Sequence, residues 1–130
     1  MPENAKILTK DQRMARAAYA CVLKQSGKDS FAEYRTFAYA FPALIHSCGL
    51  VQAAAFAQAK DKESYIADLQ AVFNWAERQD GKDEGKKLID QSREAPLSEY
   101  ARISRNALAA ASWLKRYCQA ADDSGKTDAE

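Results

Sequence analysis

The sequence predicts an all-α protein that folds as a compact single-domain helical bundle of about five to six helices. The chain has 130 residues, which suits one domain, and 26 of them are alanine. Only eight residues are valine or isoleucine and three are threonine, so helix formers greatly outnumber strand formers. We expect the bundle domain to span residues 1–121 and an acidic flexible tail to follow over residues 122–130.

The first two helices are predicted from their N-terminal capping patterns. Thr9 is followed three residues later by Gln12, which is the spacing of a capping box. Ser30 and Glu33 repeat this spacing after the turn that closes the first helix. The first helix, over about residues 10–26, is expected to bury four positions at helical spacing: Ala15, Ala18, Tyr19 and Val22.

The middle of the chain is predicted to be interrupted twice. The second helix, over about residues 30–40, should end before Pro42, because proline disfavours the α conformation at the preceding residue. A short helix should follow and end at Gly49, since glycine accepts the left-handed cap conformation. A further helix is expected from there to about Lys60.

Two later helices carry long apolar stripes, and a charged loop with two glycines over residues 80–87 and a short turn over residues 88–94 separate them. The helix from about Asp61 to Gln79 is expected to bury Tyr65, Ile66, Leu69, Val72, Phe73 and Ala76. The last helix, over about residues 97–121, is expected to bury Tyr100, Ile103, Ala107, Ala111, Leu114 and Cys118.

Enzymatic and metal chemistry is not indicated. The chain has one histidine and no glycine-rich phosphate loop of the GxGxxG or GxxxxGK[ST] type. His46 and Cys48 form a possible metal pair, but a structural zinc site needs four ligands, and Cys21 and Cys118 are not at ligand spacing. We therefore expect no metal, no cofactor and no enzymatic activity, with the three cysteines as reduced thiols.

Composition also bears on location and charge. No run of 18 apolar residues occurs and the first residues lack a secretory pattern, so we expect a cytoplasmic protein without a membrane partner. The net charge is +1, but the last nine residues hold four acids and one lysine, which leaves +4 on the rest. Any nucleic-acid-binding surface must therefore come from the arrangement of the cations.

Two helices each present a row of cations away from their predicted core faces. The row on the last helix contains no acid, whereas a plain solvated helix normally mixes charges. Because arginine binds phosphate with two parallel hydrogen bonds, these rows are candidate RNA-binding surfaces. The candidate residues are Arg13, Arg16, Lys24, Arg102, Arg105, Lys115 and Arg116. The alternative is that they are only solvated faces, and Trp113 beside them either stacks on a base or packs against a neighbouring helix.

Three segments carry a family resemblance, in order along nearly the whole chain: RMARAAYACV, FPALIHSCGLVQAAAF and YARISRNALAAASWLKRYCQAA. Their most specific parts are Pro42, Ile45, Gly49 and Leu50, and the run Trp113–Arg116. Together the segments resemble the small subunit of the type III-B CRISPR effector, the Cmr complex. Cys48 departs from that family, which often has asparagine at this position.

The resemblance implies a small non-catalytic helical subunit. In that family, copies of the subunit line up beside the subunits that hold the CRISPR RNA, and together they cradle the guide and its target RNA. The implied partners are other effector subunits, guide RNA, target RNA and further copies of the chain, and repeated weak contacts would combine through multivalency. The alternative is a structural adaptor whose basic rows dock onto neighbouring subunits and never touch RNA.

Overall fold

The structure is a helical bundle built around one long C-terminal helix. A computed structural model describes the backbone of residues 7–77 and 87–129, with side chains as far as residue 121. These residues form six helices and no strand, which confirms the predicted all-α class. The helices are α2 (Lys10–Ser26), α3 (Phe31–Cys48), α4 (Leu50–Ala59), α5 (Glu63–Glu77), α6 (Leu88–Glu94) and α7 (Leu97–Ala129). The predicted charged loop lies outside the described residues except for its last position, Lys87.

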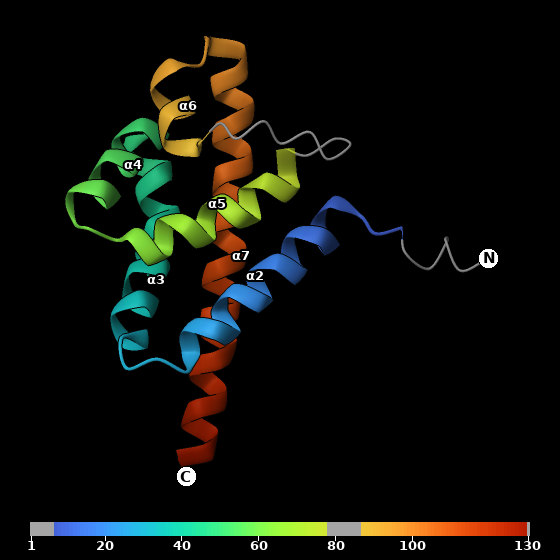
Figure 1. Cartoon of the computed structure of the whole chain (residues 1–130), viewed down its shortest axis with the longest axis vertical. Helices are drawn as coiled ribbons and strands as arrows, with labels where there is room; N and C mark the ends of the chain where they lie inside the picture. Colours follow the sequence, from blue (N-terminus) through green and yellow to red (C-terminus); the bar gives the residue numbers. More distant parts are fainter. Residues whose placement is uncertain (1–6, 78–86, 130) are drawn as a thin grey trace.

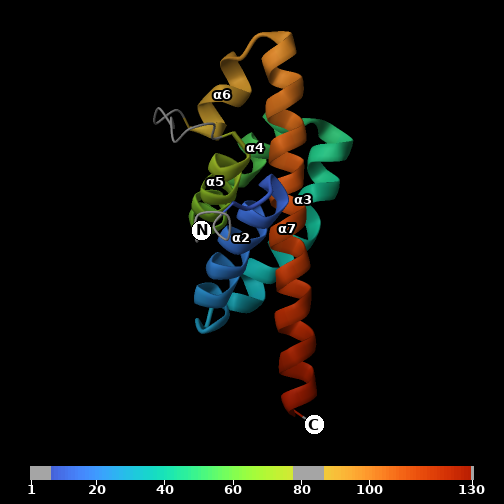
Figure 2. The ribbon, with the colours of Figure 1, turned by 90° about the vertical axis from the view of Figure 1, so that its right-hand side faces the viewer.

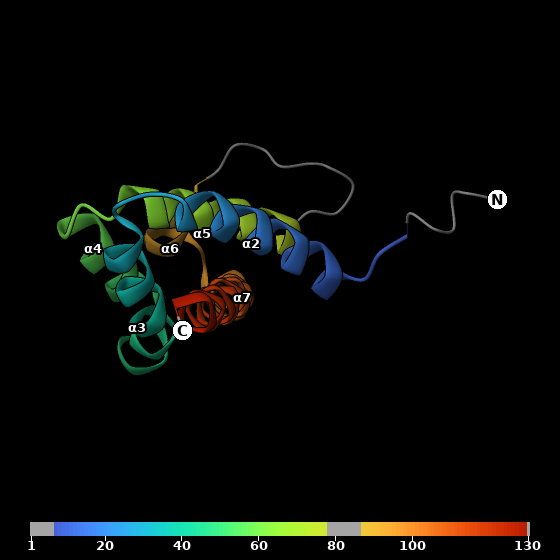
Figure 3. The same ribbon diagram turned by 90° about the horizontal axis from the view of Figure 1, so that it is seen from below.

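Helix α7 is the axis on which the other helices pack (Figure 1). It contacts α2, α3, α5 and α6, while α4 packs against α3, α5 and α6. Viewed along α7, helices α2 and α5 form one layer, and α3 and α4 stand at the side of that layer (Figure 3). Figure 2 shows that the C-terminal part of α7 extends beyond the other helices. None of the described helices is long and apolar enough to cross a bilayer.

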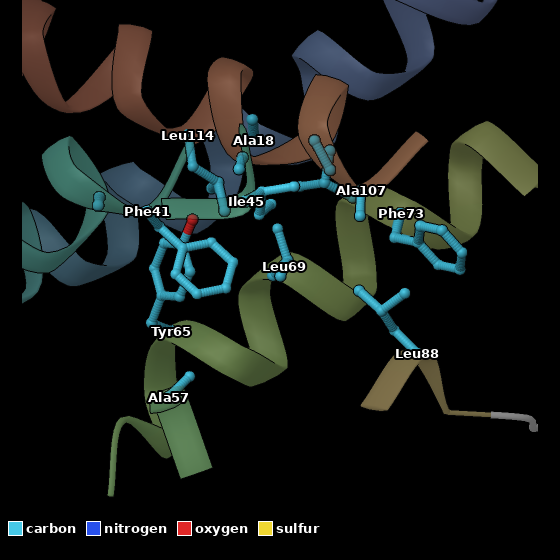
Figure 4. Close-up of a cluster of buried hydrophobic side chains, with 14 of the residues drawn as sticks. Ala18, Phe41, Ile45, Ala57, Tyr65, Leu69, Phe73, Leu88, Ala107 and Leu114 are labelled. Carbon is cyan, nitrogen blue, oxygen red and sulfur yellow. The ribbon is translucent and has the colours of Figure 1, made fainter. Parts of the chain in front are cut away.

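The core lies where α3, α5 and α7 meet (Figure 4). On α7 the predicted residues Ile103, Ala107, Ala111, Leu114 and Cys118 are all fully buried, and Tyr100 is half-buried. On α5 the predicted Tyr65, Leu69, Val72 and Phe73 are buried, while Ile66 and Ala76 are half-buried at the edge of the core. The alanines of α7 allow the neighbouring helices to approach closely, and each fully buried larger side chain contributes about 1.5–3 kcal/mol.

Helix α2 begins as predicted, and its predicted core face is confirmed in part. The Thr9–Gln12 capping box forms, with Gln12 N donating to Thr9 Oγ1 at 3.0 Å and Thr9 N donating to Gln12 Oε1 at 2.8 Å. Ala18 and Val22 are buried as predicted, Ala15 is half-buried, and the prediction is wrong at Tyr19, which is 53% exposed. Met14 and Gln25 are also buried. The buried face differs from the prediction because α2 packs against both α5 and α7. The periodicity of one helix cannot show how many neighbouring helices it contacts.

Helix α3 runs through the predicted break at Pro42. Proline in a helix interior removes one backbone hydrogen bond, which is why an end was predicted there. The helix nevertheless continues from Phe31 to Cys48, and Phe41 on its inner face is 1% exposed. Burial of this aromatic face outweighs the local penalty of the proline. The capping hydrogen bond predicted for Ser30 is also absent, although the helix begins at the next residue.

The predicted break at Gly49 is confirmed. Gly49 has φ of 87°, a region that L side chains rarely adopt, and its N–H donates to Ile45 O at 2.8 Å. The hydroxyl of Tyr100 on α7 accepts from Val51 N at 3.2 Å, so α7 caps the first turn of α4. The sharp turn between α3 and α4 is thereby fixed to the central helix.

The last two helices differ from the predicted boundaries. The segment expected as a short turn is the helix α6, and α7 continues past the predicted end at residue 121 to Ala129. No proline or early glycine stops α7, since its first glycine is Gly125. The division into a bundle domain and a separate acidic tail stays a prediction.

Candidate nucleic-acid interface

The first cation row lies on the outer side of α2. Arg16 and Lys24 are exposed, and Arg13 is half-buried. Arg13 Nη1 donates to Leu8 O at 2.6 Å, so this guanidinium is held against the segment that leads into α2. A hollow of about 390 Å³ lies here, lined by Leu8, Arg13, Arg16 and Ala17 together with Trp75 of α5. The first half of the row therefore borders a concave surface, while Lys24 lies near the other end of the helix.

The second cation row lies on α7, and one of its members already has a partner. Arg105 and Arg116 are exposed and Lys115 is half-buried. Arg102 donates to the Glu77 carboxylate of α5 through Nη2 at 2.9 Å and Nε at 3.3 Å. Hydrogen bonding to Glu77 raises the pKa of Arg102 above its usual value. No acid stands between Arg102 and Arg116 in α7, but Glu99 lies one turn before Arg102, and Glu77 from another helix pairs with Arg102.

Glu77 is the centre of a polar clasp that joins three helices. Asn106 Nδ2 of α7 donates to Glu77 Oε2 at 2.5 Å, and Lys10 Nζ of α2 donates to Asn106 Oδ1 at 2.9 Å. The clasp, formed by Lys10, Glu77, Arg102 and Asn106, ties the start of α2 and the end of α5 to α7. Arg102 thus has a structural role besides any contact with RNA.

Three aromatic rings fill the seam between α2 and α7. Trp113 stacks on Tyr117 with ring centroids 6.0 Å apart, and Tyr19 of α2 packs against Tyr117 in a T-shaped arrangement with centroids 5.5 Å apart. Trp113 is half-buried, so the structure places it in packing against neighbouring side chains of the bundle.

The contacts of this seam also relate the two cation rows. Lys10 meets Asn106 and Tyr19 meets Tyr117, so α2 and α7 run in broadly the same direction, as Figure 1 shows. At 100° per residue, Arg16 and Arg116 lie about 60° from the seam residues Tyr19 and Trp113 on their respective helices. Arg16 and Arg116 therefore flank the aromatic seam, whereas Arg13 and Lys24 lie about 120° and about 140° from Tyr19 and point further away from it.

The buried polar groups have structural contacts. Asp68 of α5 is 5% exposed and accepts from Gln25 Nε2 at 3.0 Å and from Tyr34 Oη at 2.7 Å. Burial, with the nearby Asp68, raises the pKa of the Cys21 thiol to about 12. Burial also raises the pKa of Cys118 to about 11, so neither thiol is a ready nucleophile at neutral pH.

His46 and Cys48 form a possible metal pair in the sequence, although no metal was predicted. His46 and Cys48 are both exposed at the end of α3. Within the described part of the chain, no group of three or more histidine, cysteine or acidic residues is placed to hold a metal ion. A structural zinc site needs four ligands, so these two side chains do not form one by themselves.

Three residues at this surface were missed by the sequence analysis: Trp75, Glu77 and Asn106. Trp75 lies between Phe73 and Ala76 of the α5 stripe but was not among the predicted buried residues, and its place beside Arg13 depends on how α2 packs. Glu77 and Asn106 are ordinary polar residues at helix positions, and nothing local marks them as partners. Their roles appear only once α5 and α7 are brought together.

Comparisons with known proteins agree with one another. The family model described as "CRISPR-associated protein (Cas_Cmr5)" matches residues 10–121. A protein of Thermus thermophilus named "CRISPR system Cmr subunit Cmr5" is 36% identical over 115 residues, which cover 86% of this chain and 95% of that protein. A crystal structure of a CRISPR-associated Cmr5 family protein from the same organism superposes with a TM-score of 0.75 and 32% identity. That match covers 88% of this chain and 97% of the crystallised one.

Proposed function

Because this chain belongs to the Cmr5 family, the small subunit of the Cmr CRISPR complex, we propose that its α2 and α7 cation rows line the groove that holds guide and target RNA. The observation that supports the proposal is the aromatic seam, which Arg16 of α2 and Arg116 of α7 flank. Arg16, Arg105 and Arg116 are exposed there. Such a surface suits the phosphates of an RNA backbone and needs no base-reading motif.

The subunit acts in this proposal without catalysis. The thiols of half-buried Cys21 and buried Cys118 have raised pKa values, and the buried carboxylate of Asp68 accepts hydrogen bonds from Gln25 and Tyr34. Sequence discrimination comes from base pairing between guide and target, so the subunit only has to contact backbone and shape. The other partners are neighbouring subunits and further copies of this chain, and the site of action is the cytoplasm.

Arrangement in several copies fits the modest charge of the chain. A net charge of +1 gives weak binding of RNA by one subunit alone. When several copies face one RNA, the later contacts become intramolecular and the affinity rises without new residues. Each copy needs only two or three phosphate contacts, which the exposed arginines can supply.

The test is capture of target RNA by the reconstituted complex with Arg105→Ala and Arg116→Ala combined in this subunit. Loss of two phosphate contacts should weaken capture by about tenfold and lower its salt dependence, with helical content unchanged. Arg102 stays intact, since its loss would also disturb the clasp. The matched control combines Lys28→Ala and Lys60→Ala, which removes two exposed cations elsewhere. Equal capture by both variants would contradict the proposal.

A structural adaptor is the second candidate, and the Arg102–Glu77 pair favours it. That pair shows that an arginine of the α7 row binds a carboxylate well, so the remaining arginines could bind acidic side chains of neighbouring subunits. Salt would weaken both kinds of contact, so salt dependence does not separate the two candidates. Crosslinking to RNA inside the complex does, because an adaptor gives crosslinks to protein only.

A further inference from the structure

We propose that the hollow between α2 and α5, lined by Leu8, Arg13, Arg16, Ala17 and Trp75, binds one unpaired nucleotide of an RNA strand. This inference deepens the proposed function and rests on it, because it assigns the first half of the α2 row to a single-stranded nucleotide. Its occupant has two parts, a phosphate bound by arginine and a base placed against the indole. The hollow has a volume of about 390 Å³, within the range of small-ligand sites.

The charge of the lining is what separates this hollow from others on the surface. It contains two arginines and no acid. The hollow at the junction of α6 and α7 includes Asp90, Glu94 and Glu99, and the one between α4, α5 and α6 includes Glu63 and Asp90. Carboxylates in those hollows would repel a phosphate, whereas the α2–α5 hollow attracts one.

The two arginines are suited to different tasks. Arg13 is half-buried and anchored through Nη1 to Leu8 O, so its charge is fixed at the wall of the hollow. Arg16 lies one helical turn further along α2 and is exposed. It has no ion-pair partner among the residues that the structure describes. Arg16 can therefore turn its guanidinium to a phosphate, while Arg13 keeps the local potential positive.

Trp75 gives the hollow a surface for a base. Its side chain is half-buried and packs against the core, which holds the ring in place while part of it faces the hollow. Aromatic side chains beside cations are the usual means of binding single-stranded RNA without sequence preference. A paired base inside a helix has both faces covered by its neighbours, so an indole can stack only on an unpaired or splayed base.

The chain contains only two tryptophans, which allows a direct measurement. In a Trp113→Phe variant of the full chain, the remaining fluorescence reports Trp75 alone. This variant is titrated with a single-stranded oligouridylate and, separately, with a duplex RNA of the same length. We expect saturable quenching by the single strand, because a stacked base quenches the indole, and several-fold weaker quenching by the duplex.

Arg16→Ala and Lys28→Ala in the Trp113→Phe background form a matched pair, since each removes one exposed cation. Arg16→Ala should weaken the apparent affinity for the single strand by about tenfold, and Lys28→Ala by less than about twofold. Circular dichroism shows whether the variants keep their helices. Equal loss in both variants would mean a general charge effect and would overturn the site.

The remaining outcomes are also decisive. No quenching of Trp75 at millimolar nucleotide overturns the inference, and so does stronger quenching by polyglutamate than by RNA, which would identify an acidic protein segment as the occupant. Either result leaves the α7 row untouched, since that row is tested by Arg105 and Arg116 in the assembled complex. The converse result is that RNA quenches Trp75 while Arg105→Ala and Arg116→Ala leave capture of target RNA unchanged. That result would support the nucleotide site and contradict the proposed groove.

Discussion

Removing the Glu77 carboxylate should destabilise the bundle, because this group holds α5 and α7 together. Its side chain is only 19% exposed and accepts hydrogen bonds from Arg102 and Asn106. The ion pair with Arg102, whose side chain is 47% exposed, contributes at most about 1 kcal/mol. Asn106 is 7% exposed, and leaving its buried amide without an acceptor costs about 1–2 kcal/mol.

The two contributions give an expected loss of about 2 kcal/mol for Glu77→Ala, after about 0.5 kcal/mol is regained by removing an anion near the end of α5. Glu77→Gln keeps an acceptor for Asn106 and should cost about 1 kcal/mol. Arg102→Ala should also lower the free energy of unfolding by about 1 kcal/mol or less. In a protein that already carries Glu77→Ala, adding Arg102→Ala should cause little further loss, because its partner is gone.

The free energy of unfolding is measured by urea titration with circular dichroism as the signal. The four proteins of the double-mutant cycle are the wild type, Glu77→Ala, Arg102→Ala and the double variant. A coupling energy near zero between Glu77 and Arg102 would refute the clasp. Equal losses for Glu77→Ala and Glu77→Gln would show that the contact with Asn106 contributes nothing.

Four further predictions concern Asp68, the cysteine thiols and the helix through Pro42. Asp68→Ala should lower the free energy of unfolding by about 2–4 kcal/mol, because two buried donors lose their acceptor; a urea midpoint close to wild type would rule this out. Exposed Cys48 should react with a thiol reagent at pH 8 much faster than Cys21 and Cys118, whose pKa values are raised to about 12 and about 11, and three equal rates would contradict the burial. Because the folded thiols keep protons that the unfolded chain loses above the ordinary pKa of 9.0, the free energy of unfolding should fall as pH rises above that value. Pro42→Ala should raise the free energy of unfolding by about 1 kcal/mol and raise the melting temperature, because it restores a helical N–H. A lowered melting temperature would mean that α3 needs the proline.

The parts of the fold that could be predicted from sequence are those set by one helix at a time. The stripes of α5 and α7 were predicted nearly residue by residue, because each helix presents one continuous apolar face to the core. The capping box at Thr9 and the break at Gly49 depend on local backbone chemistry and were also predicted. The continuation of α3 through Pro42 was not predicted, because it depends on the burial of aromatic side chains against other helices.

The candidate site divides in the same way. Helical spacing placed the cation rows on α2 and α7, but it could not show that Arg102 is already bound by Glu77. The clasp joins residues 29 and 96 positions apart in the chain, so no window of sequence contains it. Tyr19 was predicted to be buried but lies exposed at the edge of the aromatic seam. The reason is that α2 packs against two helices at once, which shifts its buried face away from Tyr19.

The most direct test of the central claim is ultraviolet crosslinking of the reconstituted effector with labelled guide and target RNA, followed by mapping of the crosslinked peptides. The claim predicts crosslinks in this subunit within residues 13–24 of α2 and 105–116 of α7, the two segments that flank the aromatic seam. Strong crosslinks on neighbouring subunits, with none on these two segments, would contradict it and would make the cation rows protein-docking surfaces.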